Sequence, residues 1–291
     1  MLSIDPKEIS TAQLHGYLLG AVSPRPIAFA STIDASGAVN LSPFSFFNVY
    51  SSNPPIMIFS ANRRVRDNTT KHTLQNVLET KEVVVNVVNY NIVQQTSLSS
   101  TEYEKGVNEF EKAGLTMLKS DVVKPFRVAE SPVQFECKVN EVISLGEQGG
   151  AGNLIVCEVV KLHVNEAVLD ENGQIDQYKI DLVSRMGGNW YSRANAGMFE
   201  VPKPLSSIGI GVDAIPENIR YSKVLTGNDL GILGNVESLP TATAVTDFQN
   251  TASEEIKAII KSANEEAKHK KAQQLIAQND VTTAWLLLMT R

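Results

Sequence analysis

Two long strand-like segments joined by a glycine-rich link place the strongest constraint on the fold of this chain. From Pro132 to Leu145 apolar and polar residues alternate, a period of two that is typical of a half-buried antiparallel strand. Residues 146–152 form the link, and residues 153–167 are predicted to be the strand that returns. The two segments together predict a long antiparallel hairpin.

Further strands are predicted at residues 27–33, 38–48, 56–60 and 82–88. Turn residues join the first three, so these strands are connected by short turns rather than by helical crossovers. Short helices are expected to begin near Thr70, between Asn91 and Ser100, and between Val107 and Gly114. The chain is therefore predicted to be mainly β with helices, built around an antiparallel barrel.

The character of the sequence changes after Pro202, where prolines and glycines precede a charged, helical pattern. We expect residues 1–204 to form the β domain and residues 205–291 to form a mostly helical extension. The segment Thr251-Ala-Ser-Glu254 reads as a capping box that opens one long charged helix with a single apolar stripe. That stripe predicts that the extension packs on the barrel or on another subunit.

Composition excludes several classes of function. The chain has 291 residues, 43% of them hydrophobic, and a net charge of -6, so it has enough apolar residues for a core and no global attraction for nucleic acid or anionic membranes. It shows no secretory signal, and its two cysteines, Cys137 and Cys157, do not make a disulfide framework. We expect a cytoplasmic protein without a membrane-spanning segment.

No metal site is predicted, because the four histidines have no metal-ligand spacing and no CxxC or HExxH motif occurs. The glycines at 149–152 are not followed by a helix, and no GxxxxGK[ST] sequence is present, so neither the Rossmann dinucleotide fingerprint nor a P-loop is indicated. His163 either faces a site or is a hydrogen-bonded histidine of the barrel.

The stretch from Asn40 to Asn48 alternates hydroxyls and amides with a group of phenylalanines. One interpretation is the wall of a site, in which one face stacks on a flat ring and the other offers hydrogen bonds. The other is a strand interrupted at Pro43, with its aromatic side chains in the core.

Residues 61–73 are the most cationic part of an otherwise acidic chain. Lys71, His72 and Thr73 stand where a helix is expected to start, a position that usually favours acidic residues. Backbone N–H groups, hydroxyls and cations at a helix start suit a phosphate group. The alternative is a solvated basic loop.

Three other residues are candidates for framing a planar ligand. Arg25 lies between two prolines that keep its backbone extended, whereas Arg185 and Tyr191 flank two glycines and a tryptophan. A packed surface turn is the alternative for the second group.

Taken together, these motifs resemble the flavin reductase-like family, whose members are FMN-binding split-barrel proteins and include the flavoredoxins. The resemblance covers roughly residues 23–191 and rests on five motifs in order: Ser23-Pro-Arg-Pro26, the stretch from Asn40 to Asn48, Asn53-Pro-Pro55, Lys71-x-Thr-Leu-x-Asn76 and Arg185-x-Gly-Gly-x-x-Tyr191. One departure is His72, which stands where the family usually carries Asp.

The resemblance implies a six-stranded antiparallel Greek-key barrel that forms a homodimer with FMN near the dimer interface; FAD stays open as the flavin. It implies two sets of cofactor-binding residues. The isoalloxazine ring would lie against Ser42, Pro43, Ser45, Phe46, Phe47 and Asn48. The ribityl phosphate would be held by Ser60, Arg63, Lys71 and Thr73.

The leading functional hypothesis is an oxidoreductase that takes hydride from NADH or NADPH onto the flavin, with no catalytic residue required because the cofactor carries the chemistry. A second hypothesis is an electron carrier of flavoredoxin type that does not oxidise NAD(P)H. A third is a flavin-storage or assembly module in which the helical extension recruits a partner.

Overall fold

The computed structural model describes residues 1–201 and 208–290. The chain divides into two compact units, residues 1–199 and residues 200–291, called here the N-terminal and C-terminal units. The boundary expected between residues 204 and 205 lies outside the described residues. Among the described residues, no helix is long and apolar enough to cross a membrane.

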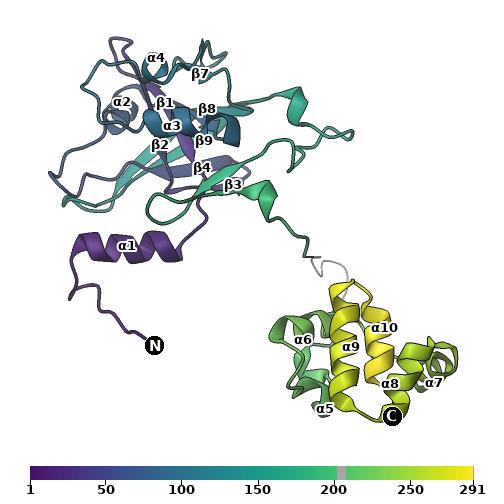
Figure 1. The fold of residues 1–291 in the computed structure, drawn as a ribbon. Helices are drawn as coiled ribbons and strands as arrows, with labels where there is room; N and C mark the ends of the chain where they lie inside the picture. Colours follow the sequence, from purple (N-terminus) through teal and green to yellow (C-terminus); the bar gives the residue numbers. More distant parts are fainter. Residues whose placement is uncertain (202–207, 291) are drawn as a thin grey trace. The chain divides into compact units, whose positions relative to one another are not determined.

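The N-terminal unit is built on one antiparallel sheet of seven strands (Figure 1). Its order is β2-β1-β5-β8-β9-β4-β3, and every neighbouring pair is antiparallel. The strands are β1 (Ala28–Ile33), β2 (Val39–Phe44), β3 (Phe47–Ser52), β4 (Pro55–Ser60), β5 (Glu82–Val87), β8 (Val133–Ser144) and β9 (Asn153–Val164). The predicted long hairpin is present as β8 and β9, which pair from Val133 opposite Val164 to Ser144 opposite Asn153.

The sheet differs from the expected barrel in two ways: it has seven strands rather than six, and it is not closed. The expected strand 38–48 is divided into β2 and β3, which lie at opposite ends of the sheet although only Ser45 and Phe46 separate them. The sheet must therefore curl until its ends approach each other. Within residues 1–201 and 208–290 no ladder joins them, and Pro43 near the end of β2 has no N–H to donate to a further strand.

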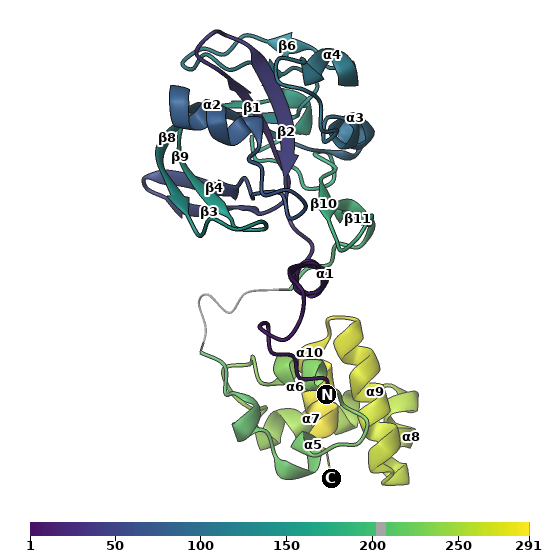
Figure 2. The ribbon, with the colours of Figure 1, turned by 90° about the vertical axis from the view of Figure 1, so that its left-hand side faces the viewer.

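Helices and two small hairpins complete the N-terminal unit. The helical elements are α1 (Thr11–Ala21), α2 (His72–Thr80), η1 (Tyr90–Ile92), α3 (Val93–Leu98), α4 (Glu109–Ala113), η2 (Glu166–Val168) and η3 (Ala194–Ala196), and the short strands are β6 (Met117–Leu118), β7 (Arg127–Val128), β10 (Val183–Arg185) and β11 (Tyr191–Arg193). Figure 2 shows α2 and α3 beside β1 and β2, and both helices contact β2. The three helices predicted between the strands are thus confirmed.

Two apolar clusters hold the sheet and its helices together. One joins α2 to the sheet through residues such as Leu74, Val77 and Phe59, and it includes the free thiols Cys137 and Cys157. The other lies under α3 and α4 and contains Phe29, Leu41 and Phe110 among others. Burial of these side chains, at roughly 25 cal/mol per Å² of apolar surface, is the main stabilising term for the unit.

The C-terminal unit is helical, as expected. Its elements are η4 (Val212–Ala214), α5 (Glu217–Arg220), α6 (Gly227–Leu233), α7 (Ala242–Thr251), α8 (Glu254–Ser262), α9 (Glu265–Ala277) and α10 (Val281–Leu288). Trp285, 2% exposed, lies in its core and donates its indole N–H to the Leu233 carbonyl at 3.1 Å.

The single long helix predicted from Thr251 onward is wrong in two details. Ser253, not Thr251, caps α8 through the Ile256 N–H. The helix then ends at Ala263, whose φ of 50° is left-handed, and Asn264 caps α9 as a new start. An asparagine that caps locally offers the backbone an alternative to continuing the helix.

Candidate functional site

Two cavities lie side by side in the N-terminal unit, because both are lined in part by Ser100. The larger, of about 400 Å³, lies among the end of β2, α3 and the β10–β11 hairpin. We call it the large cavity; it is lined by Ile27, Pro43, Phe44, Ser45, Thr96, Ser97, Ser100, Arg185, Asn189 and Tyr191. The second, which we call the cationic cavity, is lined by Asn40, Ser42, Arg64, Lys71, His72, Thr73, Ser100, Thr101, Glu102, Tyr103 and Glu109.

The β10–β11 hairpin supplies one wall of the large cavity. Arg185 and Tyr191 are paired across this hairpin, so their side chains emerge on the same face. The Arg185 guanidinium lies over the Tyr191 ring at 4.6 Å from its centroid and donates to the Gly188 carbonyl at 2.8 Å. A flat, cationic surface results.

Arg25 stabilises the β10–β11 hairpin, which forms this wall. Its guanidinium, on a residue only 5% exposed, donates to the carbonyls of Leu19, Val22 and Met186. Burial and the nearby Arg185 charge lower the pKa of Arg25 from its usual value. Because its N–H groups are bonded to backbone, Arg25 supports the site and reaches it only through a long contact of 3.5 Å with Ser45 Oγ.

The cationic cavity lies at the start of α2. Lys71 is the N-cap of this helix, and no side chain caps its first turn, so the backbone N–H groups there keep their partial positive charge. Burial and the Arg64 charge lower the pKa of Lys71, and burial together with Arg64, Lys105 and Lys71 lowers the pKa of His72. Positive charges crowded in this way favour an anionic ligand.

The floor of the cationic cavity is rigid and polar. The buried Thr73 Oγ1 accepts a hydrogen bond from Asn40 Nδ2 at 2.9 Å. The Glu109 carboxylate accepts from the Leu41 N–H at 2.9 Å, and burial raises the pKa of Glu109. These bonds fix β2 against α2 and α4.

The structure brings together seven of the residues predicted from the sequence. Four line the large cavity, namely Pro43, Ser45, Arg185 and Tyr191, and three line the cationic cavity, namely Ser42, Lys71 and Thr73. Their assignment to a cofactor stays a prediction.

Six other predicted residues lie outside both linings: Arg25, Phe46, Phe47, Asn48, Ser60 and Arg63. Phe47 packs against the core, and Phe46 contacts His15 of α1 with ring centroids 6.3 Å apart. Arg63 is turned into its own loop, where its guanidinium donates to the side chain and carbonyl of Asn68. Ser60 Oγ donates to Asn62 and accepts from the Asn153 N–H.

Sequence reasoning did not single out the hydroxyl-rich stretch that ends α3. Thr96, Ser97 and Ser100 face the large cavity, and the signal was the run of hydroxyls from 96 to 101. Arg64, not its neighbour Arg63, lines the cationic cavity.

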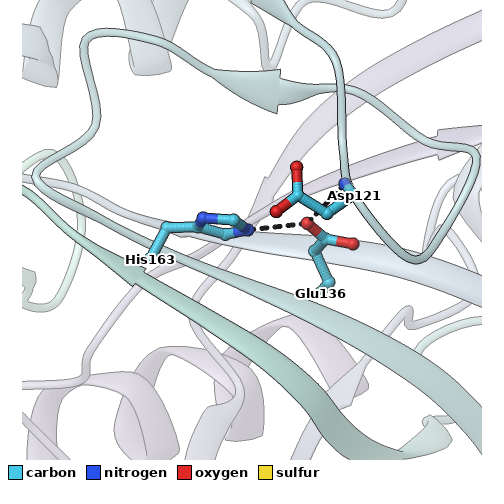
Figure 3. Close-up of side chains that lie close together, drawn as sticks. All are labelled: Asp121, Glu136 and His163. Atoms are coloured by element: carbon cyan, nitrogen blue, oxygen red, sulfur yellow. Dashed lines mark hydrogen bonds and ion pairs between the residues drawn. The ribbon is translucent and has the colours of Figure 1, made fainter.

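A separate polar cluster joins Asp121, Glu136 and His163, whose ligand-type atoms lie within 4.8 Å of one another (Figure 3). The buried Glu136 carboxylate accepts the N–H groups of Asp121, Val122 and Val123 and contacts His163 Nε2 at 2.6 Å. A carboxylate has about four lone-pair directions, and all four are taken. The cluster is therefore a structural tie, and His163 is the hydrogen-bonded histidine of the two alternatives.

Comparison with known proteins agrees with this architecture. The family model described as "Flavin reductase like domain" matches residues 20–179. An uncharacterized protein of Aquifex aeolicus (strain VF5) is 40% identical over 188 residues, which are 65% of this chain and 93% of that protein.

Two solved structures share the fold. Nitrilotriacetate monooxygenase component B from Bacillus cereus is 30% identical with a TM-score of 0.64, and the match covers 69% of this chain and 98% of that protein. The 2-nitrobenzoate 2-nitroreductase NbaA from Pseudomonas fluorescens is 24% identical with a TM-score of 0.64, and the match covers 72% of this chain and 100% of that protein. At this identity the likeness shows the fold alone. On the match over residues 20–179, the chain belongs to the flavin reductase-like family.

Proposed function

We propose that the protein is an FMN-binding oxidoreductase that uses NADH or NADPH to reduce its flavin. The observation that carries the proposal is the pair of cavities that meet at Ser100. The large cavity, at about 400 Å³, is within the usual range of roughly 300–1,000 Å³ for small-molecule sites. Its cationic neighbour supplies the positive charge that a phosphate group needs.

The residues present fit FMN. Phe44, Tyr191 and Ile27 give the large cavity apolar surface for a planar ring, whereas Ser45 and Asn189 offer hydrogen bonds to a polar edge. In the cationic cavity, Lys71, Arg64 and the uncapped start of α2 would hold the phosphate.

A bound flavin supplies the hydride-accepting chemistry, and the chain supplies position and charge. None of the ten side chains lining the large cavity is a carboxylate, a histidine or a lysine, so the lining offers no carboxyl, imidazole or amine group as a general acid or base. Arg185, braced by Tyr191 and Gly188, gives the cavity a fixed positive charge that favours electron-rich ligands and guides an anionic nucleotide.

The exposed apolar residues support a homodimer as part of the proposal. Val49 and Tyr50 of the edge strand β3 are 59% and 65% exposed, and Tyr17 and Leu18 of α1 are 53% and 50% exposed. Contact with a second copy would remove this surface from water. Sedimentation equilibrium of the full chain is expected to give twice the monomer mass, and Tyr50→Lys is expected to shift the equilibrium toward monomer.

The decisive experiment is an absorption spectrum of the purified protein supplemented with FMN, recorded anaerobically before and after NADH and then NADPH. Bleaching of the flavin band near ~450 nm supports the reductase and identifies the donor. A band that persists would favour the electron carrier or the storage module. Absence of flavin binding would remove the proposal altogether.

A further inference from the structure

The cationic cavity is lined by two carboxylates, Glu102 and Glu109. Glu109 accepts from the Leu41 N–H, whereas Glu102 lies among the cations that would hold a phosphate. Glu102 Oε1 accepts from Arg64 Nε at 2.9 Å, and Glu102 Oε2 accepts from Arg66 Nη2 at 2.9 Å. Glu102 also lines the same cavity as Lys71 and Ser42. Its two oxygens thus engage arginines as two oxygens of a phosphate would.

With Glu102 in this position the cavity is small. Its volume is about 20 Å³, and a single water already needs roughly 10–15 Å³ by this measure. A phosphate group, with four heavy atoms around phosphorus, requires more room than one or two waters. A side chain must therefore move before a phosphate enters.

Glu102 is the side chain best able to leave. It lies in the segment between α3 and α4, and its side chain is 45% exposed. The side chain of its partner Arg66 is 72% exposed. Arg64 is different: its side chain is 17% exposed and also donates to Thr69 Oγ1 and the Thr70 carbonyl. Arg64 is held by these further bonds, whereas the half-exposed Glu102 side chain can turn into solvent once its two arginine contacts are broken.

We propose that Glu102 is an internal competitor for the phosphate position, which occupies Arg64 and Arg66 until a phosphate group displaces it. The inference rests on the proposed function for the identity of the flavin, but not for the anion site itself. Glu102 then lowers the affinity for phosphorylated ligands and does not change the affinity for unphosphorylated ones. Its removal strengthens phosphate binding instead of weakening it.

The test compares wild type with Glu102→Gln and with a matched control, Glu104→Gln. Glu104 is exposed, lies two residues away and is not among the residues that line the cavity. Both variants change the net charge equally, so a general electrostatic effect would appear in both. The probes are inorganic phosphate, FMN and riboflavin, at low and constant ionic strength.

Binding of inorganic phosphate is measured by the thermal shift of the full chain, and binding of FMN and riboflavin is measured by quenching of flavin fluorescence. For Glu102→Gln we expect the dissociation constants of inorganic phosphate and FMN to fall on the order of fivefold, the effect of one unit charge near 4 Å in a water-like dielectric. Riboflavin affinity stays unchanged, and Glu104→Gln behaves as wild type.

Unchanged or weaker phosphate binding in Glu102→Gln would overturn the inference, since weaker binding would mean that Glu102 positions Arg64. An equal gain in Glu104→Gln would overturn it as well. Tighter inorganic phosphate binding without any flavin binding would support the role of Glu102 and refute the proposed flavin function. Flavin binding with the same affinity in all three proteins would refute the role of Glu102 and support the proposed flavin function.

Discussion

Replacement of Glu136 by Gln tests the carboxylate that ties the segment between β6 and β7 to the β8–β9 hairpin (Figure 3). The side chain is fully buried. Its Oε1 accepts from the Asp121 N–H and contacts His163, and its Oε2 accepts from the N–H groups of Val122 and Val123. A glutamine amide has only one accepting oxygen, so in either orientation its NH₂ group would face at least one backbone N–H donor.

The magnitude follows from the pKa of this carboxyl group. Despite burial, which raises it, the backbone N–H of Asp121, the His163 ring and the N–H groups of Val122 and Val123 lower the pKa of Glu136 from 4.5 to about 2. A difference of this size corresponds to about 3 kcal/mol of stability at neutral pH. For a unit of this size the melting temperature should fall by about 6–12 °C.

The pH dependence has a definite sign. The pKa of Glu136 in the folded state lies below its unfolded value, so the stabilisation is fully present above the unfolded pKa and is lost as pH falls toward the folded pKa. At pH 3.5 about 1.4 kcal/mol is already lost. The difference between wild type and Glu136→Gln should therefore shrink in acid.

Differential scanning calorimetry at pH 7 and at pH 3.5 measures both effects, with the helical unit as an internal reference. Glu141→Gln is the matched control, because Glu141 lies on the same strand and is exposed. A melting temperature for Glu136→Gln within 2 °C of wild type at pH 7, by the scale of about 2–4 °C per kcal/mol, would refute the reasoning. A difference that does not narrow in acid would refute the assignment to an ionised carboxylate.

Three further substitutions test other parts of the structure. Lys71→Met should weaken FMN binding at least on the order of tenfold and leave riboflavin binding unchanged in a fluorescence titration, while Lys81→Met at the other end of α2 changes neither. Gly149→Ala should destabilise the N-terminal unit by about 1–3 kcal/mol in guanidinium unfolding, because a Cβ there would lie 2.9 Å from the Val65 carbonyl oxygen. Trp285→Phe should destabilise the C-terminal unit by about 1–3 kcal/mol, since it leaves a buried carbonyl without its donor; an unchanged thermal transition of that unit would contradict this.

The strands were predictable from sequence because their signal is local. Alternation over 132–145 and the β-branched run over 82–88 produced β8 and β5 close to the expected bounds. The order of the strands in the sheet was not accessible in this way. The division of residues 38–48 into β2 and β3, at opposite ends of the sheet, depends on which strands pair, and pairing is a tertiary property.

Two neighbouring arginines show why the site was only partly predictable. The charge of the run 61–73 and the missing acidic residues at the start of α2 indicated an anion site, and Lys71 lies there with a lowered pKa. Composition does not distinguish Arg63 from Arg64. Asn68 decides which arginine reaches the cavity. Its side chain and carbonyl accept hydrogen bonds from Arg63 and hold that side chain outside the cavity, whereas Arg64 donates to Glu102 and lines the cavity. Since side chains on successive residues of an extended loop point in different directions, the chemistry of a segment can be predicted from sequence, whereas the residue that performs it depends on bonds formed only on folding.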